Sequence, residues 1–260
     1  MKIAVNRPSD AEGEELKKRL LELAERSYSQ GQFTFTSFLG LSEVSIYHSM
    51  ESKLRYASPT LFGGYEDAER GVVRFGNPET MGYDEDFPID LLEIAPLALK
   101  FSDDLTHRDF LGALMSLGIE RSLLGDIVQD GNKAYVFCLS RISEYIIENL
   151  ISVKHTSVSV RKINVDEIGV LSRKEMSEKI LQVVSLRCDA VISKVYNLSR
   201  NESTELFRRG KVFVNGCVVE NTSYVLKEED AVTVRGFGRF VYAQNIGLSR
   251  KEKVNIRILS

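Results

Sequence analysis

The fold of the C-terminal part of this chain is decided by Leu186–Gly216, which reads LRCDAVISKVYNLSRNESTELFRRGKVFVNG. Apolar residues recur at helical spacing at its start and predict a helix over 186–197. Ser199 is followed three residues later by Glu202, the spacing of a capping box, which predicts a second, short helix. Gly210 ends that helix, so two helices follow one another with almost no linker.

A β-hairpin and a further strand follow the two helices. Asn215-Gly216 is the strongest two-residue turn signal, and it joins predicted strands at 211–214 and 217–219. Ala231–Val234 predicts another strand after an acidic turn. Helix, tight turn, capped helix, hairpin and strand therefore form one compact module.

The outer surface of this module is basic. From Arg187 to the end there are 13 Lys and Arg against 8 Asp and Glu, a net charge of +5, although the whole chain carries −3. The basic end is the candidate nucleic-acid surface. On the second helix one face is apolar, and the opposite face carries Asn201, Thr204 and Arg208, with Arg209 beside them.

Several linked positions resemble a known RNA-binding module. Arg187-Cys188-Asp189, Ser199-Arg200, Arg209–Val212 and Val214–Gly216 look like the αL RNA-binding motif, which occurs in a small-subunit ribosomal protein, bacterial tyrosyl-tRNA synthetases and pseudouridine synthases. The start of the Ser199 helix offers backbone N–H groups and a positive dipole to a phosphate, and arginines surround it. The candidate RNA-binding residues are Arg187, Asp189, Ser199, Arg200, Asn201, Thr204, Arg208, Arg209, Lys211, Asn215, Arg235 and Arg239. We expect recognition of RNA shape and backbone with little base readout.

Over essentially its whole length the chain resembles the bacterial YlmH-type proteins. The resemblance is carried by Gly64–Arg70, Thr106–Gly112, Leu117–Asp126 and Arg235–Phe240. It implies a non-enzymatic protein that binds ribosomal RNA or tRNA on the large ribosomal subunit during rescue of stalled ribosomes, with a nascent-chain tailing factor as a partner. It also implies a link with cell division.

The rest of the chain predicts an α+β fold. Helices at 10–29 and 42–50 with strands at 54–57 and 72–75 indicate a small N-terminal α+β domain, 1–82. Residues 83–165 follow a βαββαβ order, which predicts a ferredoxin-like domain of the kind shared by RNA-recognition domains. Its first helix begins at Thr106, with Asp109 in the capping position. A linker, 166–185, includes a stretch at 176–184 that could be strand or helix, with strand favoured. The αL domain covers 186–260.

The sequence lacks the signals of several other classes of protein. The N-terminus lacks a secretory, transit or lipidation signal, and no apolar run is long enough to span a membrane, so a cytoplasmic location is expected. The cysteines at 138, 188 and 217 make no CxxC pair, which indicates buried thiols. The histidines are scattered, and no P-loop or dinucleotide motif occurs, so we expect no metal and no cofactor.

Two alternatives remain open at this stage. The first is an RNA-modifying enzyme of the pseudouridine-synthase kind, for which Asp109 and Asp126 are candidate catalytic residues. The second is a scaffold for division proteins that does not need RNA. Arg235–Tyr242 is one inserted Arg away from the signature of an RNA-recognition domain, but it follows the αL hairpin rather than lying on a third strand, so we interpret that match as accidental. The Arg and Phe residues of this segment remain candidates for contact with RNA, since Gly236 and Gly238 let the backbone approach closely.

Overall fold

The computed structural model describes residues 10–66, 68–168, 177–248 and 253–260. These residues divide into two compact units. The larger one comprises 14–43 and 49–168, and the smaller one comprises the described residues from 177 on together with 10–13 and 44–48. Each unit combines helices with antiparallel sheets, so the fold class is α+β, as predicted. No helix within the described ranges has the length and apolar character needed to cross a membrane.

The larger unit begins with helices packed beside a small antiparallel sheet. The predicted helices and the predicted strand at 72–75 are confirmed. The sheet has the order β1-β3-β2. The elements are α1 (Asp10–Gln30), β1 (Thr34–Phe35), α2 (Leu41–Leu54), β2 (Thr60–Phe62), β3 (Val72–Phe75) and α3 (Pro78–Met81).

The predicted strand at 54–57 is wrong. Leu54 is the last residue of α2, and Arg55–Ala57 form a turn of 3₁₀ helix. Tyr47, Met50, Leu54 and Ala57 are all buried, a spacing of three to four residues that belongs to one helical face. The apolar side chains therefore continue the helix, and Ser58 ends it in the left-handed region at φ 49°.

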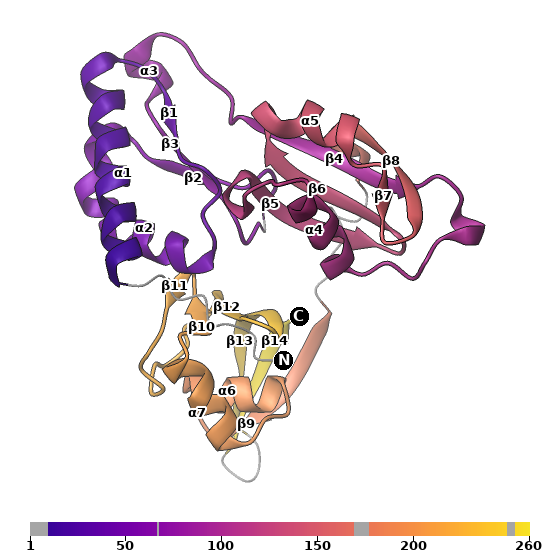
Figure 1. The fold of residues 1–260 in the computed structure, drawn as a ribbon. Coiled ribbons are helices and arrows are strands. Elements are labelled where there is room, and N and C mark those ends of the chain that lie inside the picture. Colours follow the sequence, from indigo (N-terminus) through magenta and orange to yellow (C-terminus); the bar gives the residue numbers. More distant parts are fainter. Residues whose placement is uncertain (1–9, 67, 169–176, 249–252) are drawn as a thin grey trace. The chain divides into compact units, whose positions relative to one another are not determined.

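The second part of the larger unit follows the βαββαβ order that the sequence predicts, with one added short strand. The elements are β4 (Ile89–Pro96), α4 (His107–Ser116), β5 (Leu124–Asp130), β6 (Lys133–Leu139), α5 (Ser143–Asn149), β7 (Ser152–Val153) and β8 (Thr156–Ile163). The antiparallel sheet has the order β5-β6-β4-β8-β7. Phe110 and Leu114 of α4 and Ile146 of α5 share one apolar core with this sheet, so both helices cover the same face (Figure 1).

Part of the opposite face of this sheet is also buried. Leu91, Phe137 and Ile163 form an apolar cluster with Phe38 and Val72, which come from the N-terminal part of the chain. Side chains at 91, 137 and 163 stand in one row across β6, β4 and β8, because 91 pairs with both of the others. The N-terminal part therefore closes this part of the sheet face.

The carboxylate of Asp126 helps to join the two parts of the larger unit. Asp126 on β5 accepts hydrogen bonds from the Tyr65 hydroxyl at 2.8 Å and from the backbone N–H groups of Glu69 at 2.7 Å and Arg70 at 3.2 Å. The Arg70 side chain then donates from Nε to the carbonyl oxygen of Leu124 at 2.9 Å. These bonds cross between segments more than 50 residues apart in the chain.

Gly64 lies against the sheet where no side chain would fit. An added Cβ would be 2.3 Å from the Phe137 ring, and the backbone of Gly64 is in the left-handed region at φ 102°. Tyr65 stacks on the same ring with centroids 5.1 Å apart. The joint between the two parts is thus formed by Gly64, Tyr65, Glu69 and Arg70 with Asp126, which belong to two of the stretches that carry the family resemblance.

The smaller unit packs two helices on one antiparallel sheet of the order β11-β10-β12-β13-β14-β9. Figure 1 shows α6 and α7 beside this sheet. Their buried side chains, Val191, Ile192, Leu206 and Phe207, share one core with it. The elements are β9 (Glu178–Val183), α6 (Cys188–Val195), α7 (Arg200–Arg208), β10 (Val212–Val214), β11 (Cys217–Val218), β12 (Asp230–Val234), β13 (Gly238–Leu248) and β14 (Val254–Leu259).

The ends of this sheet differ from expectation. The stretch at 176–184 contains the favoured strand, but β9 pairs with β14 and belongs to the sheet of the smaller unit. The segment predicted as a linker therefore includes a structural strand. Strand β14 was not predicted at all, since the sequence around it carries no strong turn signal.

The cysteines only partly follow the prediction of buried thiols. Cys138 and Cys188 are buried, whereas Cys217 is exposed because it lies on the two-residue strand β11 at the edge of the sheet. Burial raises the pKa of each buried thiol to about 12, so neither forms the reactive thiolate near neutral pH.

We therefore expect one cysteine of three to react under native conditions. Iodoacetamide at pH 8 should alkylate Cys217 rapidly, and all three should react after denaturation in urea. Peptide mass spectrometry locates the modified residue. The variant Cys217→Ser should resist the reagent until it unfolds, and rapid alkylation of Cys138 or Cys188 in the native protein would contradict the burial that we describe.

Candidate RNA-binding site

The candidate site is built on α6 and α7 and on the sheet beneath them. Asn197 adopts the left-handed conformation at φ 54°, which turns the chain sharply between the two helices. The Ser193 hydroxyl donates to the carbonyl oxygen of Leu198 at 2.6 Å and so binds the end of α6 to the connection. The Ser203 hydroxyl of α7 donates to the carbonyl oxygen of Asp189 at 2.8 Å. The pair of helices is therefore fixed by hydrogen bonds as well as by its apolar core.

The outer face of α7 carries the predicted cations. Arg200, Asn201, Arg208 and Arg209 are exposed, and Thr204 is partly so, whereas the opposite face is buried. Within the described residues no ion pair involves Arg200. The Glu205 carboxylate forms an ion pair with Nε of Arg209 at 2.8 Å, and it lies 3.9 Å from Nη1 of Arg208. Three arginines therefore face solvent on α7 together with two carboxylates, those of Glu202 and Glu205.

The N-terminus of α7 is less open to a phosphate than the sequence suggested. The capping box is formed: Ser199 Oγ accepts from the Glu202 N–H at 3.2 Å, and Glu202 Oε2 accepts from the Ser199 N–H at 2.8 Å. The hydrogen bonds from Ser199 lower the pKa of Glu202, which keeps its carboxylate charged. This carboxylate occupies the positive end of the helix dipole. The positive charge of α7 is therefore that of its arginines rather than that of an open helix N-terminus.

Arg187 and Asp189 bind each other. Arg187 precedes α6, and its Nε and Nη2 donate to the two carboxylate oxygens of Asp189 at 3.0 and 2.8 Å. Asp189 also accepts from the Ala190 N–H at 2.9 Å. The guanidinium keeps outward-facing N–H groups, since its side chain is 44% exposed. Asp189 thus orients Arg187, which remains able to contact a phosphate.

The candidate residues on the sheet lie at opposite ends of β10. The Arg235 N–H donates to the Lys211 carbonyl oxygen at 2.9 Å, so these two cations are neighbours at the start of the strand. Asn215 is in the turn at the other end, where its amide donates to Asp230 at 2.8 Å and accepts from the Ala231 N–H at 2.9 Å. Asn215 therefore holds the hairpin together. Arg239 pairs with Thr233 in the β12–β13 ladder.

Two aromatic residues lie near these cations, and of the two only Tyr196 was not considered from the sequence. Phe237 lies in the turn between β12 and β13, and Tyr196 follows α6, with ring centroids 5.4 Å apart. Phe237 is 45% exposed. The signal was present in the sequence, because Phe237 stands between Arg235 and Arg239 with glycine on both sides.

The sheet of the larger unit presents a different surface from that of an RNA-recognition domain. Those domains stack bases on aromatic side chains of the open sheet face. Tyr135 and Phe137 lie at that face of β6, but their exposed fractions are 9% and 0%. Phe137 is covered by Tyr65 and Phe38. Bases therefore cannot stack on Phe137 while the N-terminal part is in place.

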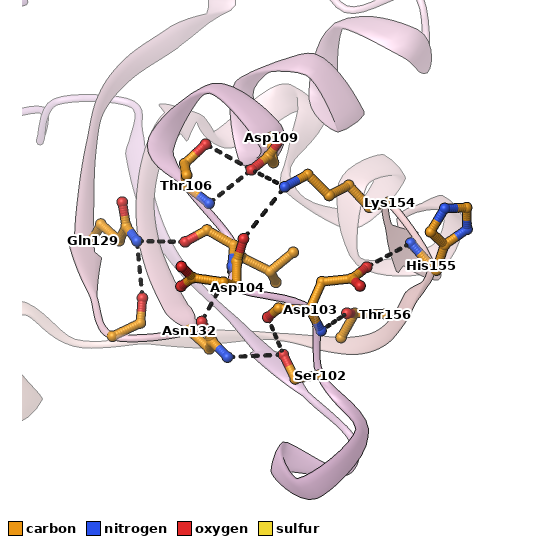
Figure 2. Close-up of polar contacts among 12 residues, drawn as sticks. Ser102, Asp103, Asp104, Thr106, Asp109, Gln129, Asn132, Lys154, His155 and Thr156 are labelled. Carbon is orange, nitrogen blue, oxygen red and sulfur yellow. Dashed lines mark hydrogen bonds and ion pairs between the residues drawn. The ribbon is translucent and has the colours of Figure 1, made fainter.

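The aspartates of the enzyme alternative are both engaged in holding the fold. Figure 2 shows Asp109 at the start of α4, where Oδ2 accepts from Thr106 N at 2.8 Å, Thr106 Oγ1 at 2.6 Å and Lys154 Nζ at 2.7 Å. These partners, Lys154 first, lower the pKa of Asp109 to about 2. Asp126 forms the joint described above.

The polar side chains around Asp109 connect three loops. The Asp103 N–H donates to Thr156 Oγ1 at 2.8 Å, and Asp103 Oδ2 accepts from the His155 N–H at 3.1 Å (Figure 2). Asn132 accepts from the Leu105 N–H at 3.2 Å. The network fixes the loops at one end of the sheet. Within the ranges that the structure describes, no group of His, Cys, Asp and Glu is arranged to hold a metal ion.

Comparison with known proteins identifies the segment between β4 and β8. Residues 83–167 match the family model described as "Putative RNA-binding domain in YlmH". The chain is 33% identical over 193 residues to ribosome-associated protein quality control protein P2 of Bacillus subtilis (strain 168), an alignment that covers 74% of this chain and 73% of that protein.

Two further proteins show more limited similarity. An uncharacterized RNA pseudouridine synthase of Aquifex aeolicus (strain VF5) is 43% identical over 51 residues, which cover 20% of this chain and 21% of the relative. A solved structure, the cell division protein ylmH from Streptococcus pneumoniae, is 17% identical with a TM-score of 0.49, covering 61% of this chain and 95% of that one.

Proposed function

The chain belongs to the YlmH family, and on that premise we propose that it binds ribosomal RNA or tRNA on the large ribosomal subunit during quality control of stalled nascent chains. A nascent-chain tailing factor is its proposed protein partner. The proposal treats the protein as a binding factor with no catalytic step of its own.

The observation that carries the proposal is the cationic outer face of α7. Its arginines project from a capped helix that hydrogen bonds and a shared apolar core fix on the sheet. Lys211 and Arg235 extend the positive charge at the end of the sheet where β10 starts. Phosphate contacts from such a surface fix register and orientation on a folded RNA and need no base edges.

The enzyme alternative gains no support from the two aspartates. A catalytic carboxylate must reach a substrate atom within about 3 Å. Asp109 and Asp126 instead receive their hydrogen bonds from Thr106, Lys154, Tyr65 and the backbone at 69 and 70. We therefore expect no conversion of uridine to pseudouridine when the protein is incubated with total ribosomal RNA.

A sucrose-gradient profile of cell extracts tests the proposed function. The protein should sediment with free large ribosomal subunits and should return to the top of the gradient after nuclease treatment or a high-salt wash. Sedimentation with neither subunits nor 70S particles would contradict the proposal. Protein partners that copurify equally well after nuclease treatment would favour the division-scaffold alternative.

A further inference from the structure

The turn between β12 and β13 presents an aromatic ring to solvent in a basic segment. Val234 pairs with Gly238, and the Phe237 N–H donates to the Val234 carbonyl oxygen at 2.9 Å, so the turn is closed. Gly236 and Gly238 have φ values of 91° and 119°, a region that side chains disfavour. Phe237 is the last residue of this turn, and it is 45% exposed.

Tyr196 supports one part of the Phe237 ring. Their centroids are 5.4 Å apart with the planes at 51°, and Tyr196 also contacts the buried Phe240 at 6.1 Å. The Tyr196 hydroxyl is buried and has no hydrogen-bond partner among the described residues. Burial raises the pKa of this phenol to about 12, so it stays neutral. The Phe237 ring therefore rests on a fixed support and leaves the remainder of its surface open.

The charged residues in the segment that forms this turn are all basic. Arg235 and Arg239 flank Phe237, and the segment 235–242 contains no Asp or Glu. The Arg235 guanidinium lies 5.7 Å from the centroid of the Phe213 ring, which positions it on the sheet. Lys211 is its backbone neighbour. An exposed ring within a cationic segment has the two features by which proteins hold unpaired nucleotides, a stacking surface and phosphate contacts.

We propose that Phe237 stacks on an unpaired base of the bound RNA while Arg235 and Arg239 contact the adjacent phosphates. The inference rests on the proposed function and sharpens it. The outer face of α7 contacts the RNA backbone, and Phe237 selects RNA that displays an unpaired nucleotide at the edge of that contact. Stacking is tolerant of base identity because every base has an aromatic face.

The absence of tryptophan from the chain provides a direct test. Phe237→Trp introduces a single indole at the turn. Its emission should be quenched when a hairpin RNA with an unpaired loop binds, and it should change little with a fully paired duplex of the same stem. The matched control is Phe62→Trp, which alters a phenylalanine of similar exposure, 40%, in the larger unit. The control emission should stay constant with both RNAs.

Affinity measurements separate stacking from a merely structural role of Phe237. Anisotropy of labelled hairpin RNA should show that Phe237→Ala and Phe237→Leu both bind about tenfold more weakly, because each removes the aromatic face. Phe237→Leu keeps an apolar side chain against Tyr196, so full affinity in that variant would overturn the inference. Unchanged emission of Phe237→Trp while labelled RNA binds would also overturn it.

The same measurements distinguish this inference from the proposed function. Tight binding of both RNAs by the unsubstituted protein, without any effect at Phe237, leaves the function intact and removes the stacking role. Failure of the unsubstituted protein to bind either RNA contradicts the proposed function itself, and the inference falls with it.

Discussion

Replacement of both Arg200 and Arg208 by alanine is expected to weaken RNA binding at least tenfold at moderate salt. Both side chains are exposed on the outer face of α7, with Arg208 76% exposed. Each cation that neutralises a phosphate releases counterions, which contributes about 0.7 to 0.9 to the slope of log affinity against log salt concentration. Loss of two such contacts should therefore reduce that slope by about 1.5.

The contact of Arg208 with Glu205 does not offset this effect. The two groups are 3.9 Å apart and exposed, a geometry that contributes about 0 to 1 kcal/mol. Affinity is measured by titration of labelled RNA at several salt concentrations. The control is Arg19→Ala with Arg55→Ala, which removes two exposed arginines of the larger unit that lie outside the segment 83–167. A folded Arg200→Ala, Arg208→Ala variant with unchanged affinity and slope would refute the assignment of α7.

Replacement of Asp126 by alanine is expected to have the largest effect on stability, a loss of about 3 kcal/mol. The change removes an acceptor used by the Tyr65 hydroxyl and by two backbone N–H groups. Hydrogen bonds to a charged group contribute about 1.5 to 3 kcal/mol each, and the partial exposure of Asp126 reduces the total. Asp126→Asn keeps one carbonyl oxygen as an acceptor, so its stability should lie between that of the wild type and that of Asp126→Ala.

Urea unfolding followed by circular dichroism measures the effect. The urea concentration at the midpoint of unfolding should be lower for Asp126→Ala than for the wild type. The N-terminal part should unfold before the remainder of the larger unit, so the variant should show two transitions. Asp130→Ala is the matched control, because Asp130 is exposed at the end of the same strand. Equal midpoints for the wild type and Asp126→Ala would show that the joint contributes little.

Features that depend on nearby residues could be predicted from the sequence. The capping residues Thr106 and Asp109 start α4 as expected, and Asn215-Gly216 makes the hairpin turn with φ of 49° and 76°. The same holds for Ser199 and Glu202. Each signal is contained within four residues, so the local chemistry determines the outcome.

Features that depend on distant contacts could not be predicted. The sheet face at Phe137 is covered by Phe38 and Val72, which lie at least 65 positions earlier in the sequence. The strand at 178–183 is recognised as part of the smaller unit only through its pairing with β14. The predicted capping box included Glu202, whose carboxylate lies at the start of α7. A phosphate bound there would be repelled by this carboxylate. The spacing of the residues alone does not show whether the carboxylate or a phosphate occupies the helix N-terminus.

The shared apolar cluster at Phe137 has a consequence for how this protein can be divided. A fragment cut to begin at residue 83, where the family match starts, would leave Leu91, Phe137 and Ile163 without the side chains that cover them. Such a bare patch promotes aggregation. We therefore expect the segment before residue 83 and the one after it to fold as one unit, and a division of the chain between them would have to supply a new cover for the sheet.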